Sequence, residues 1–293
     1  MHSFLRAIGF SNITDREAAD SLLADVCASC DERNAVRLEN GDAFVEYVKE
    51  FAPGSGIIVC GEIDGNGFHR DYYFPYYKTD TVSSCADLVI EKHAGKDSFA
   101  GICEDVRMGT SLIFYVMNAA QYQRQAAKTR MENGNISVTL TGLSTEGKIL
   151  LPVCKRPDQD LLDMEAASSR SRLIMEAKNG DESAIESLTL EDIDTYNMIS
   201  RRIMTEDVFS IVDTFFMPFG MECDRYQLMG EIQSYKKVKN SRTKEYIYQM
   251  KLLCNNMYVD VCINEADLLG DPETGRRFKG EIWLLGHINF IES

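Results

Sequence analysis

Two groups of basic side chains near the C-terminal end suggest the most direct chemistry. Ammonium and guanidinium groups held together bind phosphate, nucleic acid or an acidic protein surface. Residues 221–293 carry 10 basic and 11 acidic side chains in all, so the two groups stand out locally. Lysine-rich turns also occur as purely solubilising loops, and that alternative stays open. The candidate anion- or partner-binding residues are Lys236, Lys237, Lys239, Arg242, Lys244, Arg276, Arg277 and Lys279.

A histidine beside an aromatic-rich run is a second candidate. His69 leads into residues 70–77, which contain four tyrosines and a phenylalanine. Imidazole exchanges protons near neutral pH, and aromatic rings can line a ligand pocket. We therefore take His69 and Tyr72 as candidate pocket residues. The alternative is a strand that is half core and half surface.

Other residue types that commonly carry chemistry lack the required spacing. The four histidines are isolated, and Cys27 and Cys30 form a single CxxC pair at the predicted C-terminal end of a helix, where the dipole does not favour a thiolate. The chain has nine cysteines, which we interpret as reduced thiols. We expect no metal and no cofactor. Whether the chain is an enzyme stays open.

The pattern of residues 1–157, which must position His69 and Tyr72, predicts an α+β domain. Strands are predicted at 3–10, 56–63, 68–77, 86–91, 99–104, 111–117, 136–141 and 148–154, and 43–51 fits helix or strand. Helices are predicted at 15–30, capped by Thr14, and at 118–131. The sequence Asp64-Gly65-Asn66-Gly67 is typical of a hairpin turn. Without regular strand–helix alternation, we expect a mixed or antiparallel sheet.

Residues 158–220 form an acidic connecting segment, with 14 acidic and 5 basic side chains. Apolar residues recur every three or four positions in two runs, which predicts two helices that each bury one stripe. Thr189 and Thr205 are the expected N-caps. The stripes are Leu190, Ile193, Tyr196, Ile199 and Ile203 in the first helix, and Val208, Ile211, Val212 and Phe215 in the second.

Residues 221–293 predict a small antiparallel sheet or barrel with strands at 226–235, 245–253, 257–264 and 280–290. An OB-like barrel is one candidate. If these strands form a simple meander, the connection after the first strand and the connection after the third emerge at the same end. Both basic groups would then lie on one rim.

The overall charge limits the classes of partner. The chain has 293 residues and a formal charge of -15, which disfavours nucleic acid while leaving it open. Residues 1–10 do not resemble a secretory signal, and no apolar run approaches the roughly 20 residues that span a bilayer. We expect a cytoplasmic protein without membrane contact.

Five segments resemble a clostridial Firmicutes family, a domain of unknown function that covers nearly the whole chain. They are FLRAIGF at 4–10, SLTLEDIDTY at 187–196, EDVFSIVDTFF at 206–216, DVCIN at 260–264 and GRRFKGEIWL at 275–284. The resemblance implies a bacterial, cytoplasmic setting. It implies no activity, cofactor or catalytic residue.

Three hypotheses follow. The first is a binding or interaction protein with an anionic partner at the basic loops. The second is an enzyme with a carboxylate or histidine in an N-terminal cleft. The third is a homo-oligomer that uses the acidic helices and exposed apolar residues.

Overall fold

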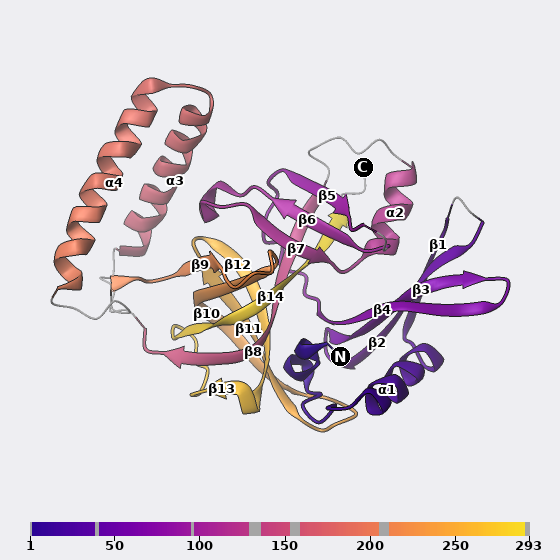
Figure 1. Ribbon diagram of the computed structural model, residues 1–293. Coiled ribbons are helices and arrows are strands. Elements are labelled where there is room, and N and C mark those ends of the chain that lie inside the picture. Colours follow the sequence, from indigo (N-terminus) through magenta and orange to yellow (C-terminus); the bar gives the residue numbers. More distant parts are fainter. Residues whose placement is uncertain are drawn as a thin grey trace.

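The computed structural model describes residues 2–38, 41–94, 97–128, 136–152, 159–204 and 211–290. Figure 1 shows a small sheet near the N-terminus, a larger sheet that curls into a barrel, and a helical hairpin to one side. The predicted α+β class is confirmed, with antiparallel pairing in the first sheet and mixed pairing in the second.

The first sheet is a four-stranded antiparallel meander in the order β1-β2-β3-β4. Its tightest turn is the predicted hairpin, where Asp64 Oδ1 accepts from the amides of Asn66 and Gly67 at 2.7 and 3.1 Å. The short helix α1 (Arg16–Ala28) packs on this sheet. The strand bounds are β1 (Glu32–Arg37), β2 (Ala43–Ala52), β3 (Ser55–Asp64) and β4 (Gly67–Tyr77).

The second sheet has ten strands, and five of them close on themselves. Strand β8 (Ile136–Leu150) runs parallel to β12 (Met257–Asn264) on one side and antiparallel to β14 (Arg277–Phe290) on the other. Strands β10 (Arg225–Lys239) and β11 (Tyr246–Cys254) complete the ring β8-β12-β11-β10-β14. These five strands form a small closed barrel. The closing strand, β8, comes from the N-terminal half of the chain.

The remaining strands extend or cover the barrel. Strand β14 also pairs in parallel with β7, which continues the sheet through β6 to β5. The two β-rich regions of the chain therefore share one sheet. The remaining strands of this sheet are β5 (Leu88–Lys92), β6 (Phe99–Cys103), β7 (Leu112–Val116), β9 (Phe215–Pro218) and β13 (Leu268–Leu269).

A phenylalanine ring fixes the packing of β7 between its two neighbours. The Phe114 side chain is fully buried. A Cβ atom added to Gly101 of β6 would lie 2.1 Å from the ring, and one added to Gly286 of β14 would lie 2.2 Å from it. Glycine is therefore required by close approach on both sides.

Several local predictions were wrong. Residues 3–8 form a 3₁₀ helix, η1 (Ser3–Ile8), because four of its side chains turn inward and Gly9 ends it with φ 87°. Asp15, not Thr14, caps α1 by accepting from the amide of Ala18 at 2.8 Å. The two strands predicted at 136–154 are one continuous strand.

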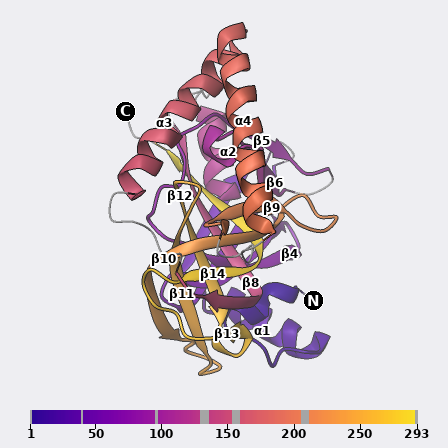
Figure 2. The same ribbon diagram turned by 90° about the vertical axis from the view of Figure 1, so that its left-hand side faces the viewer.

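The acidic segment forms a helical hairpin of α3 (Gln159–Lys178) and α4 (Glu182–Ile203). Figure 1 shows it to one side of the strands, and in Figure 2 it overlaps them and extends beyond them at the top. Thr189 does not cap a helix, because α4 runs through it and its hydroxyl donates to the carbonyl of Ile185 at 2.8 Å. Thr205 and Val208 lie outside the described residues, and Phe215 is in strand β9 rather than in a helix.

The predicted stripe of α4 is mostly exposed. Of its members, Ile199 is half-buried, and Leu190, Ile193 and Tyr196 are exposed. The side chain of Ile203 lies outside the described part of the structure. None of the described helices is long and apolar enough to cross a membrane.

Candidate functional site

A cleft of about 660 Å³ lies between the N-terminal sheet, helix α2 (Ala119–Lys128) and the end of β14. This volume is in the range of small-molecule sites. Strands β1 and β2 contribute alternate residues, because side chains on one face of a strand recur every second position. The wall residues used below are Glu32, Glu46, Glu50, Tyr76, Lys78, Asp80, Arg124 and His287.

Glu46 is the most unusual of these side chains. It lies in the middle of β2 and is 2% exposed. Its Oε1 accepts from the backbone amide of Ala120 at 2.9 Å, in the first turn of α2. Burial raises the pKa of the Glu46 carboxyl to about 7, although the amides of Ala119 and Ala120 and the charge of Arg124 lower it. The carboxyl therefore exchanges a proton near neutral pH.

Side chains on both flanks hold α2 over this carboxyl. Asn118, just before the helix, exchanges two hydrogen bonds with the backbone of Ile288 at 2.9 and 3.0 Å. Arg124 donates to the Oδ1 atom of Asn34 on β1 at 3.2 Å. The first turn of α2 is thus tied to both sheets.

His287 gives the cleft a neutral imidazole. Its Nδ1 lies 3.1 Å from the Oδ1 of Asn289, whose amide nitrogen donates to Ser137 and Thr139. This orientation makes Nδ1 the protonated ring nitrogen and leaves Nε2 as an acceptor. Burial, followed by the charge of Lys78, lowers the pKa of His287 to about 4, so the ring is uncharged at pH 7.

The loop after β4 forms another wall, and the barrel holds it in place. Thr79 donates to Asp260 of β12 at 2.8 Å, and Thr141 of β8 donates to the carbonyl of Tyr77 at 2.6 Å. Lys78 and Asp80 are therefore presented on a fixed loop.

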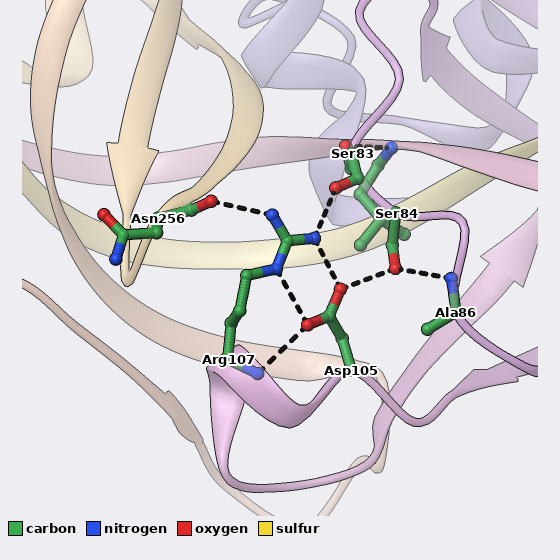
Figure 3. Close-up of polar contacts among 7 residues, drawn as sticks. Ser83, Ser84, Ala86, Asp105, Arg107 and Asn256 are labelled. Carbon is green, nitrogen blue, oxygen red and sulfur yellow. Dashed lines mark hydrogen bonds and ion pairs between the residues drawn. The ribbon is translucent and has the colours of Figure 1, made fainter. Parts of the chain in front are cut away.

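Figure 3 shows a cluster of polar contacts around Arg107 that holds the same loop further along, at Ser83 and Ser84. The guanidinium donates twice to Asp105, at 2.9 and 2.5 Å, once to the carbonyl of Ser83 at 3.0 Å and once to that of Asn256 at 2.7 Å. Ser84 donates to the same carboxylate at 2.6 Å. These groups bond to one another and to the backbone, so we interpret the cluster as structural.

The mouth of the cleft is acidic. Its lining contains four carboxyl groups and two basic side chains, Lys78 and Arg124. Burial, followed by the charges of Glu50, Glu32 and Asp31, raises the pKa of Tyr76, which lines the cleft with Glu32 and Glu50. A cationic group would be attracted here, next to an aromatic ring.

The sequence-predicted basic residues do not form one open patch. Lys237 pairs with Glu265 at 2.5 Å, Arg242 with Asp25 at 2.6 Å and Arg276 with Glu273 at 2.9 Å. Among the others, Lys244 donates to the carbonyl of Ser241, and Lys236, Lys239 and Lys279 lie on strands β10 and β14. Binding of an anionic partner by these residues stays a prediction.

Arg277 has a different environment. It is buried, and its guanidinium donates to the carbonyl of Leu151 at 3.0 Å and to that of Val212 at 2.9 Å. These carbonyls lie just before and just after the α3–α4 hairpin. Arg277 therefore joins the two ends of the inserted hairpin.

His69 and Tyr72 are not brought together in one pocket. His69 is exposed and contacts Asp64 at 3.2 Å. Tyr72 lies in a second, more open cavity of about 850 Å³ with Trp283 and His93, and its hydroxyl donates to the carbonyl of Asp97 at 2.7 Å. Burial lowers the pKa of His2, in the same cavity, to about 4.

The described cysteines are free thiols. Cys27 lies at the C-terminal end of α1, and burial raises the pKa of its thiol, which argues against a reactive CxxC pair. Cys154 lies outside the described residues. Among the residues that the structure describes, no cluster of His, Cys, Asp or Glu could hold a metal ion.

A family model described as "Domain of unknown function, E. rectale Gene description (DUF3881)" matches residues 5–286. The chain belongs to this family. The sequence resemblance to a domain-of-unknown-function family over nearly the whole chain is thereby confirmed. No curated protein and no solved structure matched the chain. Within this DUF3881 chain, the case for function therefore depends on the cleft itself.

Sequence reasoning missed Glu46, although one signal was present. Glu46 is flanked by Phe44 and Val45 on one side and by Tyr47 and Val48 on the other, in a run that fits helix or strand. If residues 43–51 are assigned as a strand, the apolar residues around Glu46 point to both faces of the sheet and predict that both faces are buried there. A carboxylate at such a position is unusual in a protein core.

Proposed function

We propose that this protein binds a small polar molecule with an amine or other cationic group in the acidic cleft, and that Glu46 is the group that exchanges protons with it. The observation that carries the proposal is a nearly fully buried carboxylate that lines the cleft, with Glu32 and Glu50 on the same wall. A buried ionised carboxylate is unfavourable unless it is paired. A cationic ligand supplies that pair.

The same arrangement offers acid–base chemistry. Glu46 changes protonation near neutral pH, whereas His287 stays neutral and offers an acceptor nitrogen. Two groups with separated pKa values are the usual basis of proton transfer in an enclosed site. We therefore favour ligand binding coupled to proton transfer over the docking of a large anionic partner.

Thermal unfolding with small probes tests this function. We expect agmatine and putrescine to raise the melting temperature by a few degrees, since ligand at about one hundred times its Kd adds about 2.7 kcal/mol to the free energy of unfolding. Succinate, of similar size and opposite charge, should not raise it. Equal stabilisation by amines and by succinate would contradict the proposal.

Two double variants localise the binding. Glu32→Gln/Glu50→Gln removes two charges from the cleft and should abolish the effect of the amines. The matched control, Glu17→Gln/Glu104→Gln, removes two exposed charges that do not line the cleft. Amine stabilisation that persists in the first variant, or disappears in the second, would show that the cleft is not the site.

A further inference from the structure

Helix α4 carries an apolar face that is exposed among the residues that the structure describes. We name Ile185, Leu190, Ile193 and Tyr196 the α4 face. Their exposed fractions are 48%, 58%, 51% and 73%. At 100° per residue these four positions fall within an arc of about 140°. Four large apolar side chains on one arc are unusual for a solvent-facing helix surface.

Helix α3 of the same hairpin packs against a different arc of the α4 surface, next to the α4 face. Ala184 is buried, and Leu188 and Ile199 are half-buried. Arg170 of α3 reaches Asp192 at 2.6 Å and Glu191 at 3.5 Å. Apolar residues thus extend around more of α4 than one neighbouring helix can cover. A two-helix hairpin to one side of the barrel needs a further helix to bury the rest (Figure 1).

We infer that the α4 face is the contact between two copies of this chain, packed antiparallel about a two-fold axis near Ile193. Charge decides the orientation. Glu182 and Glu186 lie at the N-terminal end of the face, and Arg201 lies at its C-terminal edge. In the antiparallel arrangement Glu186 of each copy lies opposite Ser200 of the other, so Arg201 is one position away and its long side chain can reach the carboxylate. A parallel arrangement would place the acidic ends together.

The antiparallel register also matches the apolar residues. With the axis at Ile193, this residue meets its own copy, and Leu190, three positions before it, faces Tyr196, three positions after it. A two-fold contact is self-complementary by construction, which suits a face that has large residues on both sides of its centre. The two hairpins together then form a four-helix bundle.

The first experiment measures the mass of the full chain by light scattering and by sedimentation equilibrium. We expect a dimer at micromolar concentration. Ile193→Glu places two carboxylates, one from each copy, next to each other at the two-fold axis, and it should raise the dimer Kd more than roughly 100-fold. A monomeric wild-type chain, or a variant that dimerises as well as the wild type, would overturn the proposal.

The matched control is Met198→Glu on the same helix. Met198 is 55% exposed but lies about 140° around the helix from Ile193. It should leave the mass and Kd unchanged, and circular dichroism should show that both variants keep the same helix content. A loss of dimer in both variants would refute the assigned face.

A charge swap tests the orientation. Glu186→Arg alone and Arg201→Glu alone should each raise the Kd roughly tenfold, and the double variant should restore it. Only the antiparallel arrangement pairs these two residues across the contact. A double variant as weak as the single ones would exclude the proposed orientation. These readouts are independent of the cleft.

Discussion

At the scale of single residues, Glu46 couples the cleft to stability. Its carboxyl has a pKa of about 7 in the folded chain, compared with 4.5 for an unperturbed glutamate. Between these two values the folded chain holds a proton that the unfolded chain has released. Protonation of Glu46 therefore stabilises the folded chain. This stabilisation is fully present below about pH 4.5 and is lost as the pH rises through 7.

Glu46→Gln should remove this dependence, because glutamine keeps the oxygen that accepts from Ala120 but does not ionise. We expect the free energy of unfolding of the variant, relative to the wild type, to rise by roughly 3 kcal/mol between pH 4.5 and pH 8. Urea unfolding at a series of pH values measures it. Glu50→Gln, which replaces an exposed glutamate of the same strand, is the control. A flat difference for Glu46→Gln would mean that this carboxyl does not titrate as described.

The residue scale also shows where sequence reasoning ends. The basic residues could be named from their types, but their environments could not. Arg277 is adjacent to Arg276 in sequence, yet it is buried and binds two carbonyls, whereas Arg276 pairs with a surface glutamate. This difference depends on Leu151 and Val212, which are more than 60 residues away along the chain, and no local pattern encodes such a contact.

At the scale of elements, local signals were sufficient where the contacts were local. The hairpin at Asp64 and the strands β3, β4, β11 and β12 follow from alternation and turn residues. Strand β1 was missed because its sequence, ERNAVR, is polar, and β9 was mistaken for helix because it is a four-residue strand paired with only one neighbour. The cleft could not be predicted, since it requires α2 to lie over β2.

Packing between elements gives a sharper prediction at Gly286. A methyl group there would overlap the buried ring of Phe114, so Gly286→Ala should lower the free energy of unfolding by about 1–3 kcal/mol. Phe114→Leu in the same chain should recover part of that loss, because the smaller side chain leaves room. Gly65→Ala is the control, since a Cβ at Gly65 meets nothing within 4 Å. Denaturant unfolding compares the four proteins, and equal stability of Gly286→Ala and wild type would rule out the overlap.

At the scale of the whole molecule, the α3–α4 hairpin is an insertion into a barrel that closes without it. The guanidinium of Arg277 donates to the backbone carbonyls of both Leu151 and Val212, so the two ends of the insertion lie close together. Replacing residues 153–210 with a Gly-Ser linker of about six residues should leave a folded barrel. We expect an unchanged Trp283 fluorescence spectrum and a monomer by light scattering. An unfolded product would show that the hairpin is needed for the barrel.

The position of β8 has a consequence for how the chain is made. A ribosome completes β8 at residue 150, whereas its sheet neighbours, β12, β13 and β14, all come from the last forty residues. At about 5–20 residues per second, roughly 110 to 140 residues must be added before those neighbours exist, which takes several seconds to half a minute. During that interval the nascent chain exposes two unpaired edges of a fifteen-residue strand. Translation speed through the hairpin region therefore sets how long this strand is open to mispairing.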